Sequence, residues 1–311
     1  MKSETPRVSV IMSVRNGAAY LREAVDSILA QSFGDFEFII VDDASDDETP
    51  RILAEYAAAD SRIVLLVNDE NLRLSRSLNR ALAVARGTYI ARQDADDLSL
   101  PDRFARQVER FDAEPDLGLL GTAFDICDAN GRRVGTQVVP ITDTEIRLQM
   151  LFDNAFCHAS MMLRRRVLPG VIGGYDATVR YAQDYELWSR LLRVTRGANL
   201  AEPLVVHRQH EANVTTRAHD EQQQTAVRIA AREIAEHCPS VVLTLDEVGA
   251  LRRWYQQPPK RIEPNETRFA QAMLALLDAF ERRPDVDPDS ARPLCERWRR
   301  CVRAALPASA V

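Results

Sequence analysis

The sequence predicts an α/β protein, with a Rossmann-like, mostly parallel sheet flanked by helices and a C-terminal helical extension. Over roughly the first hundred residues, apolar strand-like segments alternate with amphipathic helix-like segments through short connections. Several of the strand-like segments end in Asn or Asp, at the edge where parallel sheets bind ligands. From about residue 220 the chain is rich in Ala, Arg and Glu with Pro-rich joints, which indicates helices.

Composition limits the class of protein. The 311 residues exceed one average domain and favour one large domain with an appendage. The net charge of −6 provides no broad attraction for nucleic acid, so we expect no nucleic-acid partner. The five cysteines are scattered and form no C-x-x-C pair, which predicts neither a zinc site nor a disulfide framework. The N-terminus is short and polar, and no apolar run reaches transmembrane length, so we expect a soluble, cytoplasmic protein.

The first half of the predicted sheet can be read from local patterns. Nearly continuous apolar runs are typical of parallel strands buried on both faces, and apolar residues at helical spacing indicate helices that cover them. The predicted strands are residues 8–12, 36–41, 63–67 and 89–91, and the predicted helices are residues 21–29, 49–59 and 74–85.

The alternation ends after a helix predicted at 104–111. Further strands are predicted at 117–123, 156–163 and 204–207, and a further helix at 184–192. Asn130–Gly131 predicts a hairpin turn, and Gly173–Gly174 predicts a tight turn.

Three carboxylates follow the strand predicted at 89–91, namely Asp94, Asp96 and Asp97. Asp is a poor strand residue and like charges repel, so the cluster indicates more than a turn. Oxygen ligands at a strand end suit Mg²⁺ or Mn²⁺ when the cation also holds a phosphate. The alternative is an acidic loop in which Asp97 or Ser99 caps a helix that opens near Pro101.

Two common phosphate-binding loops are absent from the sequence. No G-x-G occurs among the twelve glycines, so the dinucleotide fingerprint is missing. The only lysines are Lys2 and Lys260, and neither follows a Gly, so there is no Walker A loop. A sheet without a glycine cradle must hold a phosphate by another device, of which a carboxylate-bound metal is the obvious one. We expect Asn16, Asp42, Asp43 and residues 94–97 to converge at one crevice.

Five segments, in the right order and spacing, resemble the family 2 glycosyltransferases with the GT-A fold. The segments are VSVIMSVRNG (8–17), FIIVDDAS (38–45), ARQDADD (91–97), GGYD (173–176) and YAQDYELW (181–188). The resemblance covers roughly residues 7–215. It implies an enzyme that transfers a sugar from a nucleotide-diphosphate donor to a hydroxyl acceptor, with inversion at the anomeric carbon. The processive signature Q-x-x-R-W is absent, which indicates a non-processive enzyme.

The resemblance also implies a role for each matching residue. Asp184 matches the catalytic base, and Asp96 matches the direct ligand of a divalent metal, Mn²⁺ or Mg²⁺. His210 matches a late histidine that helps to bind metal or diphosphate. Asp43 lies where a carboxylate receives the nucleobase N–H, and Asp94 faces ribose or metal. The implied nucleotide-binding residues are Ser13, Asn16, Asp42, Asp43, Asn79 and Asp94; the implied acceptor-side residues are His158, Gln183 and Trp188.

The sequence departs from the family pattern at four positions. Ser13 and Arg15 replace the usual Pro and Tyr, Ala44 replaces a common Gly, and Gln183 stands where Glu is frequent. None of these changes removes a group that the chemistry requires, but they leave the base and the sugar open.

Plainer interpretations stay open for several of these residues. Asp184 could cap its helix, and Asp42–Asp43 could form an Asx-turn. His158 and Trp188 could be core residues, and His210 could be a surface histidine.

We expect residues 1–219 to form the catalytic domain, with a nucleotide-binding half at about 7–97 and an acceptor half at about 98–219. Residues 220–311 would form the helical region. The expected donor is a nucleotide-diphosphate sugar of the UDP or dTDP type. The expected acceptor is a saccharide or lipid-linked saccharide in bacterial surface polysaccharide or glycolipid assembly.

Two other functions and one membrane contact remain to be weighed. A sugar-nucleotide pyrophosphorylase would need a Gly-rich N-terminal loop with Lys or Arg, which residues 13–17 do not supply. A non-catalytic nucleotide-sugar-binding protein would not need both Asp96 and Asp184. The helical region either packs as an appendage or makes peripheral contact with the inner face of a membrane, where arginines beside Trp298 would meet anionic lipid. These arginines are Arg297, Arg299, Arg300 and Arg303.

Overall fold

The computed structural model describes residues 5–168, 173–211, 213 and 218–306. The chain divides into two compact units. The first comprises Met1–Ile141 and Phe156–Arg217, and the second comprises Thr142–Ala155 and Ala218–Val311. The short segment Thr142–Ala155 thus belongs to the second unit although it interrupts the sequence of the first.

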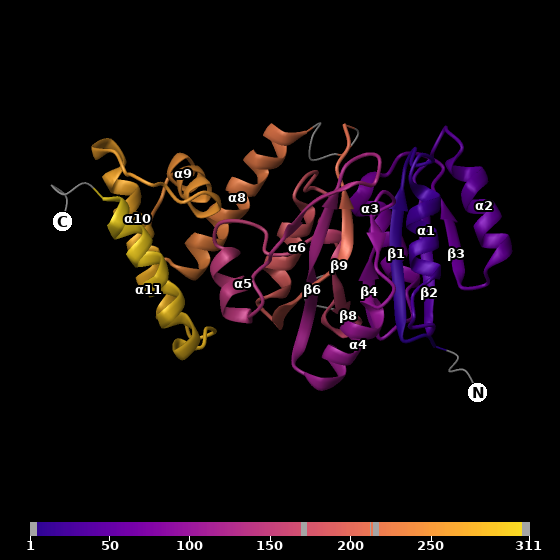
Figure 1. The fold of residues 1–311 in the computed structure, drawn as a ribbon, viewed down its shortest axis with the longest axis horizontal. Helices are drawn as coiled ribbons and strands as arrows, with labels where there is room; N and C mark the ends of the chain where they lie inside the picture. The colour runs from indigo at the N-terminus through magenta and orange to yellow at the C-terminus, as the bar shows by residue number, and fades with distance from the viewer. Residues whose placement is uncertain (1–4, 169–172, 212, 214–217, 307–311) are drawn as a thin grey trace. The chain divides into compact units, whose positions relative to one another are not determined.

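The first unit is built on a sheet that has nine strands within the described residues. Its first half is parallel, in the order β3-β2-β1-β4, so the chain moves outward from β1 and then returns to its other side (Figure 1). The strand order reverses between β1 and β4, which makes their carboxyl ends the topological switch point. The strands predicted in this half are confirmed: they are β1 (Val8–Val14), β2 (Phe36–Asp42), β3 (Ile63–Val67) and β4 (Tyr89–Arg92).

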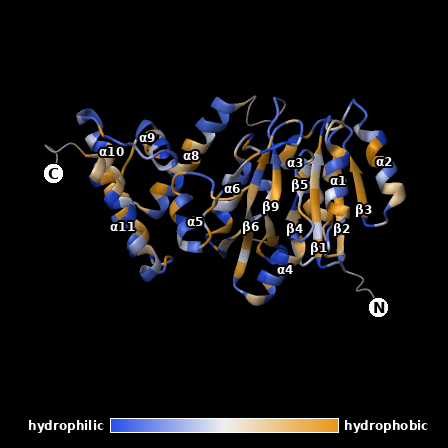
Figure 2. Ribbon diagram, viewed as in Figure 1, coloured by the Kyte–Doolittle hydropathy of each residue, from blue (hydrophilic) through white to orange (hydrophobic). Residues whose placement is uncertain are grey.

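Helices cover this half of the sheet. Alternate residues of β1, such as Val10 and Met12, share one apolar core with residues of α1, α2 and α4, while α3 contacts β1 and β2 without contributing to that core. Figure 2 shows the apolar strands and the amphipathic helices around them. Because helices pack on the sheet, β2 is buried along all seven residues, which explains its continuous apolar run. The helices are α1 (Leu21–Leu29), α2 (Thr49–Ala59), α3 (Arg73–Val84) and α4 (Arg103–Ala113).

The second half of the sheet is mixed. β8 runs antiparallel to both β4 and β6, β6 and β9 are parallel, and β5 closes the order on β9. β7 pairs with β6 through the predicted hairpin at Asn130–Gly131, where Gly131 has φ +81°. These strands are β5 (Leu98–Ser99), β6 (Leu117–Cys127), β7 (Arg133–Gln137), β8 (Met162–Arg164) and β9 (Arg196–Arg208).

Two strand predictions in this half differ from the structure. The strand predicted at 156–163 is wrong over most of its length, because His158–Ser160 forms a 3₁₀ turn and only β8 pairs. The strand predicted at 204–207 is the end of β9, which begins at Arg196. Gly197 and Pro203 break its apolar pattern, and the register with β6 shifts near Pro203, so the earlier part gave no strand signal.

The second unit is helical, as predicted from the composition. Thr142 and Thr244 begin two of its helices with capping boxes that involve Glu145 and Glu247. Phe152 stacks on Tyr255 at 4.8 Å, and Tyr255 stacks on Trp298 at 4.7 Å, which binds the segment 142–155 into the helical core. The helices are α5 (Asp143–Gln149), α8 (His219–His237), α9 (Leu245–Gln256), α10 (Thr267–Glu281) and α11 (Pro288–Ala305).

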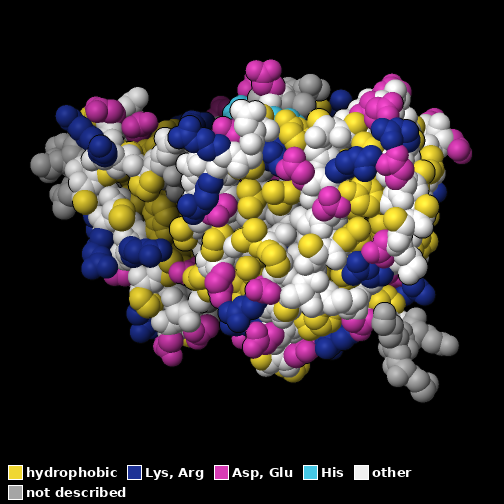
Figure 3. Space-filling model, turned by 45° about the vertical axis from the view of Figure 1, so that its right-hand side comes forward, with side chains coloured by type: hydrophobic (Ala, Val, Ile, Leu, Met, Phe, Trp, Pro, Cys, Tyr) yellow, Lys and Arg dark blue, Asp and Glu magenta, His cyan; other side chains and the backbone are white. Residues whose placement is uncertain are grey.

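On the face drawn in Figure 3, acidic and basic side chains are interspersed with scattered apolar ones. None of the described helices combines the length and the hydrophobicity that are needed to span a bilayer.

Candidate functional site

The loops after β1 and β2 interlock at the carboxyl edge of the sheet. The side-chain amide of Asn16 donates to Asp46 Oδ1 at 2.7 Å and accepts from the backbone N–H of Asp46 at 2.9 Å. The loop after β4 lies alongside, because a Cβ at Gly17 would stand 3.8 Å from Cβ of Ala95. Ser13 is the penultimate residue of β1, opposite Val41. Three loops therefore meet at the switch point, as the sequence predicts.

Asp42 and Asp43 have clear structural partners. Asp42 Oδ1 accepts a hydrogen bond from the backbone of Ser45, as in the plainer turn interpretation. Asp43 is 3% exposed, and its carboxylate accepts from the backbone N–H groups of Leu72 and Arg73 at 2.8 and 2.9 Å and from Asn68 Nδ2 at 2.6 Å. Asp43 thereby ties the end of β2 to the first turn of α3. Its contact with a nucleobase stays a prediction, and the carboxylate has about one acceptor position left for it.

Strained backbone marks the same region. Among the described residues, the non-glycine residues with positive φ are Asn16 (53°), Ala44 (56°), Arg73 (69°) and Ala182 (53°). Each lies in a loop after a strand or at the start of α3 or α6 (Gln183–Leu191). This conformation costs about 1–2 kcal/mol for a residue with a Cβ, and such strain gathers at functional sites.

Each carboxylate after β4 has its own cationic or hydrogen-bonding partner. Asp94 pairs with Arg92. Asp96 Oδ2 lies 3.0 Å from His210 Nε2. Both carboxylate oxygens of Asp97 lie 3.1 Å from His207 Nδ1, which donates to them.

The capping alternative for Asp97 and Ser99 is wrong. α4 begins at Arg103 and makes no side-chain cap bond. Asp97 accepts from the backbone N–H of Arg208, and the Ser99 hydroxyl donates to Gln93. Asp97 therefore joins the loop after β4 to the end of β9.

The crowded negative charge raises the pKa values of Asp96 and His207. Burial raises the pKa of Asp96 to about 6, with the charges of Asp97 and Asp94 acting in the same direction and His210 opposing them. Burial alone would lower the pKa of His207, but Asp97, Asp94 and Asp96 outweigh it and raise the pKa to about 9. His207 is therefore a cation at neutral pH, and it offsets part of the carboxylate charge.

The residues around Asp96 fit a divalent cation. Asp96 and His210 present an oxygen and a nitrogen donor side by side, and both donor types suit Mn²⁺. Within the described ranges, no three His, Cys, Asp or Glu side chains are arranged as a complete protein cage. Two protein donors would leave coordination positions for water and phosphate oxygens, which is how Mg²⁺ and Mn²⁺ usually bind substrates.

A buried chain of side chains runs from Asp94 to Tyr175, in the segment before α6. Arg92 is 2% exposed; besides pairing with Asp94, its Nε donates to His158 Nε2 at 3.2 Å. The Tyr175 hydroxyl lies 2.7 Å from the same nitrogen. Because Arg92 can only donate, His158 Nε2 accepts and Nδ1 carries the proton. Burial and the charge of Arg92 lower the pKa of His158 to about 3, so the ring is neutral.

Asp184 belongs to α6, whose Trp188 ring lies 6.1 Å from the ring of His158 and 6.5 Å from that of Tyr175. Asp184 is the second residue of α6, which begins after Ala182 without a side-chain cap, so the capping alternative for Asp184 is wrong. Burial raises the pKa of Tyr175, and the charges of Asp184 and Asp94 add to this effect. The charges of Asp184 and Asp94 thus both act on this phenol. The hydrogen-bonded residues Arg92, His158 and Tyr175 connect the end of β4 to the segment that precedes α6.

Two other predicted acceptor-side residues, Trp188 and Gln183, are buried. Trp188 is fully buried and its ring lies 6.1 Å from His158 and 6.5 Å from Tyr175, so the core interpretation of Trp188 is confirmed. Gln183, the first residue of α6, is buried as well. The side-chain amide of Asn79 donates a hydrogen bond to the backbone carbonyl of Tyr175 and accepts one from its backbone N–H. Its contact with a nucleotide stays a prediction.

Three residues of this network received no role from the sequence, although two of them lie within the matching segments. Arg92 and Tyr175 form the chain described above, and the fully buried Arg103 donates to the carbonyls of Arg92 and Met161 at 2.8 and 3.1 Å. Arg103 thus holds the end of β4 against the start of β8. The sequence held one sign of this network: Arg92 ends an otherwise apolar strand, and a buried charge requires partners.

The comparisons with known proteins agree with this geometry. Residues 9–169 match the profile of the family described as Glycosyl transferase family 2. The chain is 40% identical over 204 residues to EpsE of Bacillus subtilis (strain 168), which is named a glycosyltransferase, covering 64% of this chain and 72% of that protein. It is 32% identical over 210 residues to the O-antigen biosynthesis glycosyltransferase WbnJ of Escherichia coli, covering 65% and 80%. The chain belongs to glycosyl transferase family 2, and it is a glycosyltransferase.

Solved structures share the fold. S. aureus TarS 1–349 in complex with UDP-GlcNAc superposes with a TM-score of 0.62 at 18% identity, covering 96% of this chain and 89% of that one. The mannosyltransferase PcManGT from Pyrobaculum calidifontis, in complex with GDP-Man and Mn²⁺, gives 0.55 at 18% identity, covering 98% and 86%. The predicted GT-A fold is confirmed.

Proposed function

We propose that this protein is an inverting, metal-dependent, non-processive glycosyltransferase that moves a sugar from a nucleotide-diphosphate donor to a hydroxyl acceptor. The observation that carries the proposal is the convergence of two motifs distant in sequence. Asp94, which follows β4, pairs with Arg92, and Arg92 is linked through His158 to the Tyr175 hydroxyl. The Tyr175 ring lies 6.5 Å from Trp188 of α6, the helix that begins with Gln183 and Asp184. A transferase needs such a meeting point, because the leaving group and the acceptor must flank one sugar.

Asp96 and His210 would hold the divalent cation, with Asp94 facing ribose or metal. When bound, the cation supplies positive charge that stabilises the departing nucleoside diphosphate. Asp96 and His210 are held in place by Asn213, whose Nδ2 lies 3.4 Å from Asp96 Oδ2 and whose Oδ1 accepts from the backbone of His210. Predicted contacts with the nucleotide come from Ser13, Asn16, Asp42, Asp43, Asn79 and Asp94.

Asp184 would accept the proton of the acceptor hydroxyl on its carboxylate. An ordinary Asp carboxyl has a pKa near 3.9 and is ionised at neutral pH, as a base must be. General base catalysis of this kind is worth about 10²–10⁴-fold. Attack from the side opposite the leaving group inverts the anomeric centre in a single displacement. Tyr175, His158 and Arg92 would keep the two carboxylates apart and the pocket rigid.

The substrate classes are proposed by likeness. TarS and PcManGT are described with UDP, UDP-GlcNAc and GDP-Man, which supports a nucleotide-sugar donor; we favour the UDP or dTDP type. WbnJ is named for O-antigen biosynthesis, which supports an acceptor that is a saccharide or lipid-linked saccharide in bacterial surface polysaccharide or glycolipid assembly. We place the enzyme in the cytoplasm, because all five cysteines are free thiols.

We assign the activity to the first unit, since every proposed site residue belongs to it. For the helical region we favour a packed appendage over a membrane contact. Arg299 pairs with Asp278 and Glu281, and Trp298 stacks on Tyr255, so two of the residues expected to meet lipid are already engaged. Binding to anionic vesicles that falls when Arg297, Arg300 and Arg303 become Gln would overturn this preference.

A thermal-shift screen of nucleotide sugars, with and without Mn²⁺, tests the proposal. A ligand at a hundred times its Kd adds about 2.7 kcal/mol of stability, which is a readily measured shift. We expect one donor to stabilise the protein only when Mn²⁺ is present, and that donor to be consumed faster when a saccharide acceptor is added. A product nucleoside triphosphate formed from pyrophosphate would instead identify a pyrophosphorylase. Binding without any donor turnover would identify a non-catalytic binding protein.

A further inference from the structure

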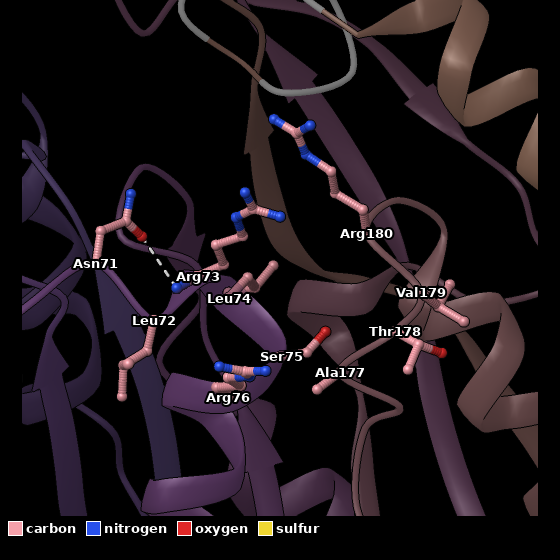
Figure 4. A pocket seen from close by; sticks show the side chains of 10 residues that line it. All are labelled: Asn71, Leu72, Arg73, Leu74, Ser75, Arg76, Ala177, Thr178, Val179 and Arg180. Carbon is pink, nitrogen blue, oxygen red and sulfur yellow. Dashed lines mark hydrogen bonds between the residues drawn. The ribbon is translucent and has the colours of Figure 1, made fainter.

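A cavity of about 360 Å³ lies in the first unit beside the first turn of α3. One wall is formed by Asn71–Arg76 and the other by residues 177–180 of the loop that leads to α6 (Figure 4). Arg73 and Arg76 come from the helix side, and Arg180 comes from the loop side. Asp94, Asp96, His210 and Asp43 are not among the residues that line the cavity.

Both walls of the cavity are held in place. On the helix side, Asp43 accepts from the backbone N–H groups of Leu72 and Arg73. On the loop side, Asp176 Oδ1 accepts from the backbone and the hydroxyl of Thr178 at 2.8 and 2.7 Å. The neighbouring Tyr175 is also bound to Asn79 of α3, so hydrogen bonds hold the backbone of both walls.

The charge of the cavity is opposite to that of its surroundings. The chain has a net charge of −6 and the adjacent site is crowded with carboxylates, yet the ten lining residues include three arginines and no Asp or Glu. None of the three guanidinium groups pairs with a described carboxylate; Arg180 instead lies over the ring of Tyr181 at 5.1 Å. Arg73 also keeps a side chain at φ +69°, where Gly would be free of strain. Guanidinium groups bind phosphate with paired hydrogen bonds, so this cluster suits a phosphate.

The position of the cavity indicates which substrate would bring the phosphate. Arg180 precedes Asp184, the proposed base, by four residues, and the loop that carries it runs directly into α6. The proposed donor site has its own device for diphosphate in Asp96 and His210. A group bound between Arg76 and Arg180 would therefore belong to the molecule that approaches Asp184.

We propose that this cavity is a subsite for a phosphate group carried by the acceptor. The inference rests on the proposed function and deepens it, because it makes the acceptor an anionic, phosphate-bearing molecule rather than a neutral sugar. A neutral saccharide would make no use of three arginines that form no ion pair within the described part of the chain.

The test uses inorganic phosphate on protein that is already saturated with UDP and Mg²⁺, so that the donor site is filled. We compare the wild type, the double variant Arg76→Gln/Arg180→Gln and the control Arg132→Gln, an exposed arginine on the hairpin of the same unit. Titration calorimetry at low ionic strength should show phosphate binding to wild type and control, and at least tenfold weaker binding to the double variant. UDP affinity should agree within twofold among the three. The single variant Arg180→Gln, placed in a loop, should show part of the loss if the double variant unfolds.

Three results would overturn the inference or its basis. Equal phosphate binding by wild type and double variant, or none by either, would refute the subsite. Phosphate binding that UDP abolishes would assign the cavity to the donor and refute the acceptor assignment. A wild type that does not bind UDP with Mg²⁺ would instead count against the proposed function, and phosphate titration of the free protein would then test the cavity alone.

Discussion

The side-chain amide of Asn79 donates to the backbone carbonyl of Tyr175 and accepts from its backbone N–H, each at 2.8 Å. The two residues are 96 positions apart in the chain, so one polar side chain of α3 fixes the loop that carries the acceptor-side motif. Gly174 is required beside this contact, because a Cβ there would stand 2.1 Å from Asn79 Oδ1. Helix α3 and the segment that leads to α6 are joined at this point.

Asn79→Ala should therefore lower both stability and turnover. The substitution leaves two backbone groups without their partners, which costs about 1–3 kcal/mol, and it releases the loop before Asp184. Urea unfolding and donor turnover measure the two effects. Asn79→Asp keeps the acceptor for the Tyr175 N–H but sets a carboxylate oxygen against the Tyr175 carbonyl, so it should lose stability as well. A change below about 0.5 kcal/mol in Asn79→Ala would contradict the clamp.

Asp184→Asn should retain metal-dependent nucleotide binding and lose turnover by about 10²–10⁴-fold, because the amide cannot accept the hydroxyl proton. Asp102→Asn is the matched control, since Asp102 is an exposed carboxylate bonded to Ser32 and lies outside the proposed site. Binding is measured by calorimetry and turnover by release of nucleoside diphosphate. Near-normal turnover in Asp184→Asn would remove this residue from the role of base.

Asp96→Asn should weaken Mn²⁺-dependent binding of UDP at least tenfold. One contact to a charged group is worth about 1.5–3 kcal/mol, which corresponds to roughly 10–150-fold in affinity. Chelation of the metal with EDTA should have the same effect on the wild type and little further effect on the variant. Asp102→Asn, which removes an exposed carboxylate bonded to Ser32, should bind as the wild type does. Unchanged affinity in Asp96→Asn would exclude this carboxylate as a metal ligand.

Ala44→Gly should stabilise the protein. Ala44 has φ +56°, a conformation that costs about 1–2 kcal/mol with a Cβ, and the entropy lost by Gly on folding returns about 0.5–1 kcal/mol of this. The net gain should be about 0.5–1 kcal/mol in the free energy of unfolding. Ala54→Gly, in the exposed face of α2, should instead lose about 1 kcal/mol. Destabilisation by both substitutions would mean that Ala44 carries no strain.

The second unit should lose stability in acid through Asp285. Burial opposes ionisation of this carboxyl, but Arg283 and Arg147 outweigh it and lower its pKa to about 2. Because the pKa is lower in the folded state, the ionised carboxyl stabilises the folded protein at every pH above the unfolded-state pKa near 3.9. This contribution is lost as the pH falls toward the folded-state pKa of about 2. The melting temperature of Asp285→Asn should thus be lower than that of the wild type at pH 7. The two melting temperatures should approach each other near pH 2.5. A difference in melting temperature that stays constant with pH would contradict the ion pair.

Local patterns were sufficient for the parallel half of the sheet. The helices and strands from β1 to β4 follow from hydrophobic periodicity, because each segment is buried along a continuous run or along one face. Local pattern failed where pairing is short or broken. The apolar residues 156–163 contain a 3₁₀ turn and a three-residue strand, and the polar start of β9 pairs with β6 despite its composition.

By itself the sequence determined the family, the parallel core and the edge of the sheet where Asp94, Asp96 and Asp97 lie, since these depend on short segments and on the rule that parallel strands end together. Only the tertiary structure decided the partners of those carboxylates: His210 reaches Asp96 across 114 residues, and Arg92 reaches Tyr175 through His158. The physical reason is that these contacts join residues that are far apart in the sequence. Periodicity records which face of a segment is buried, whereas the pairing of distant charges depends on strand order, which no local pattern encodes.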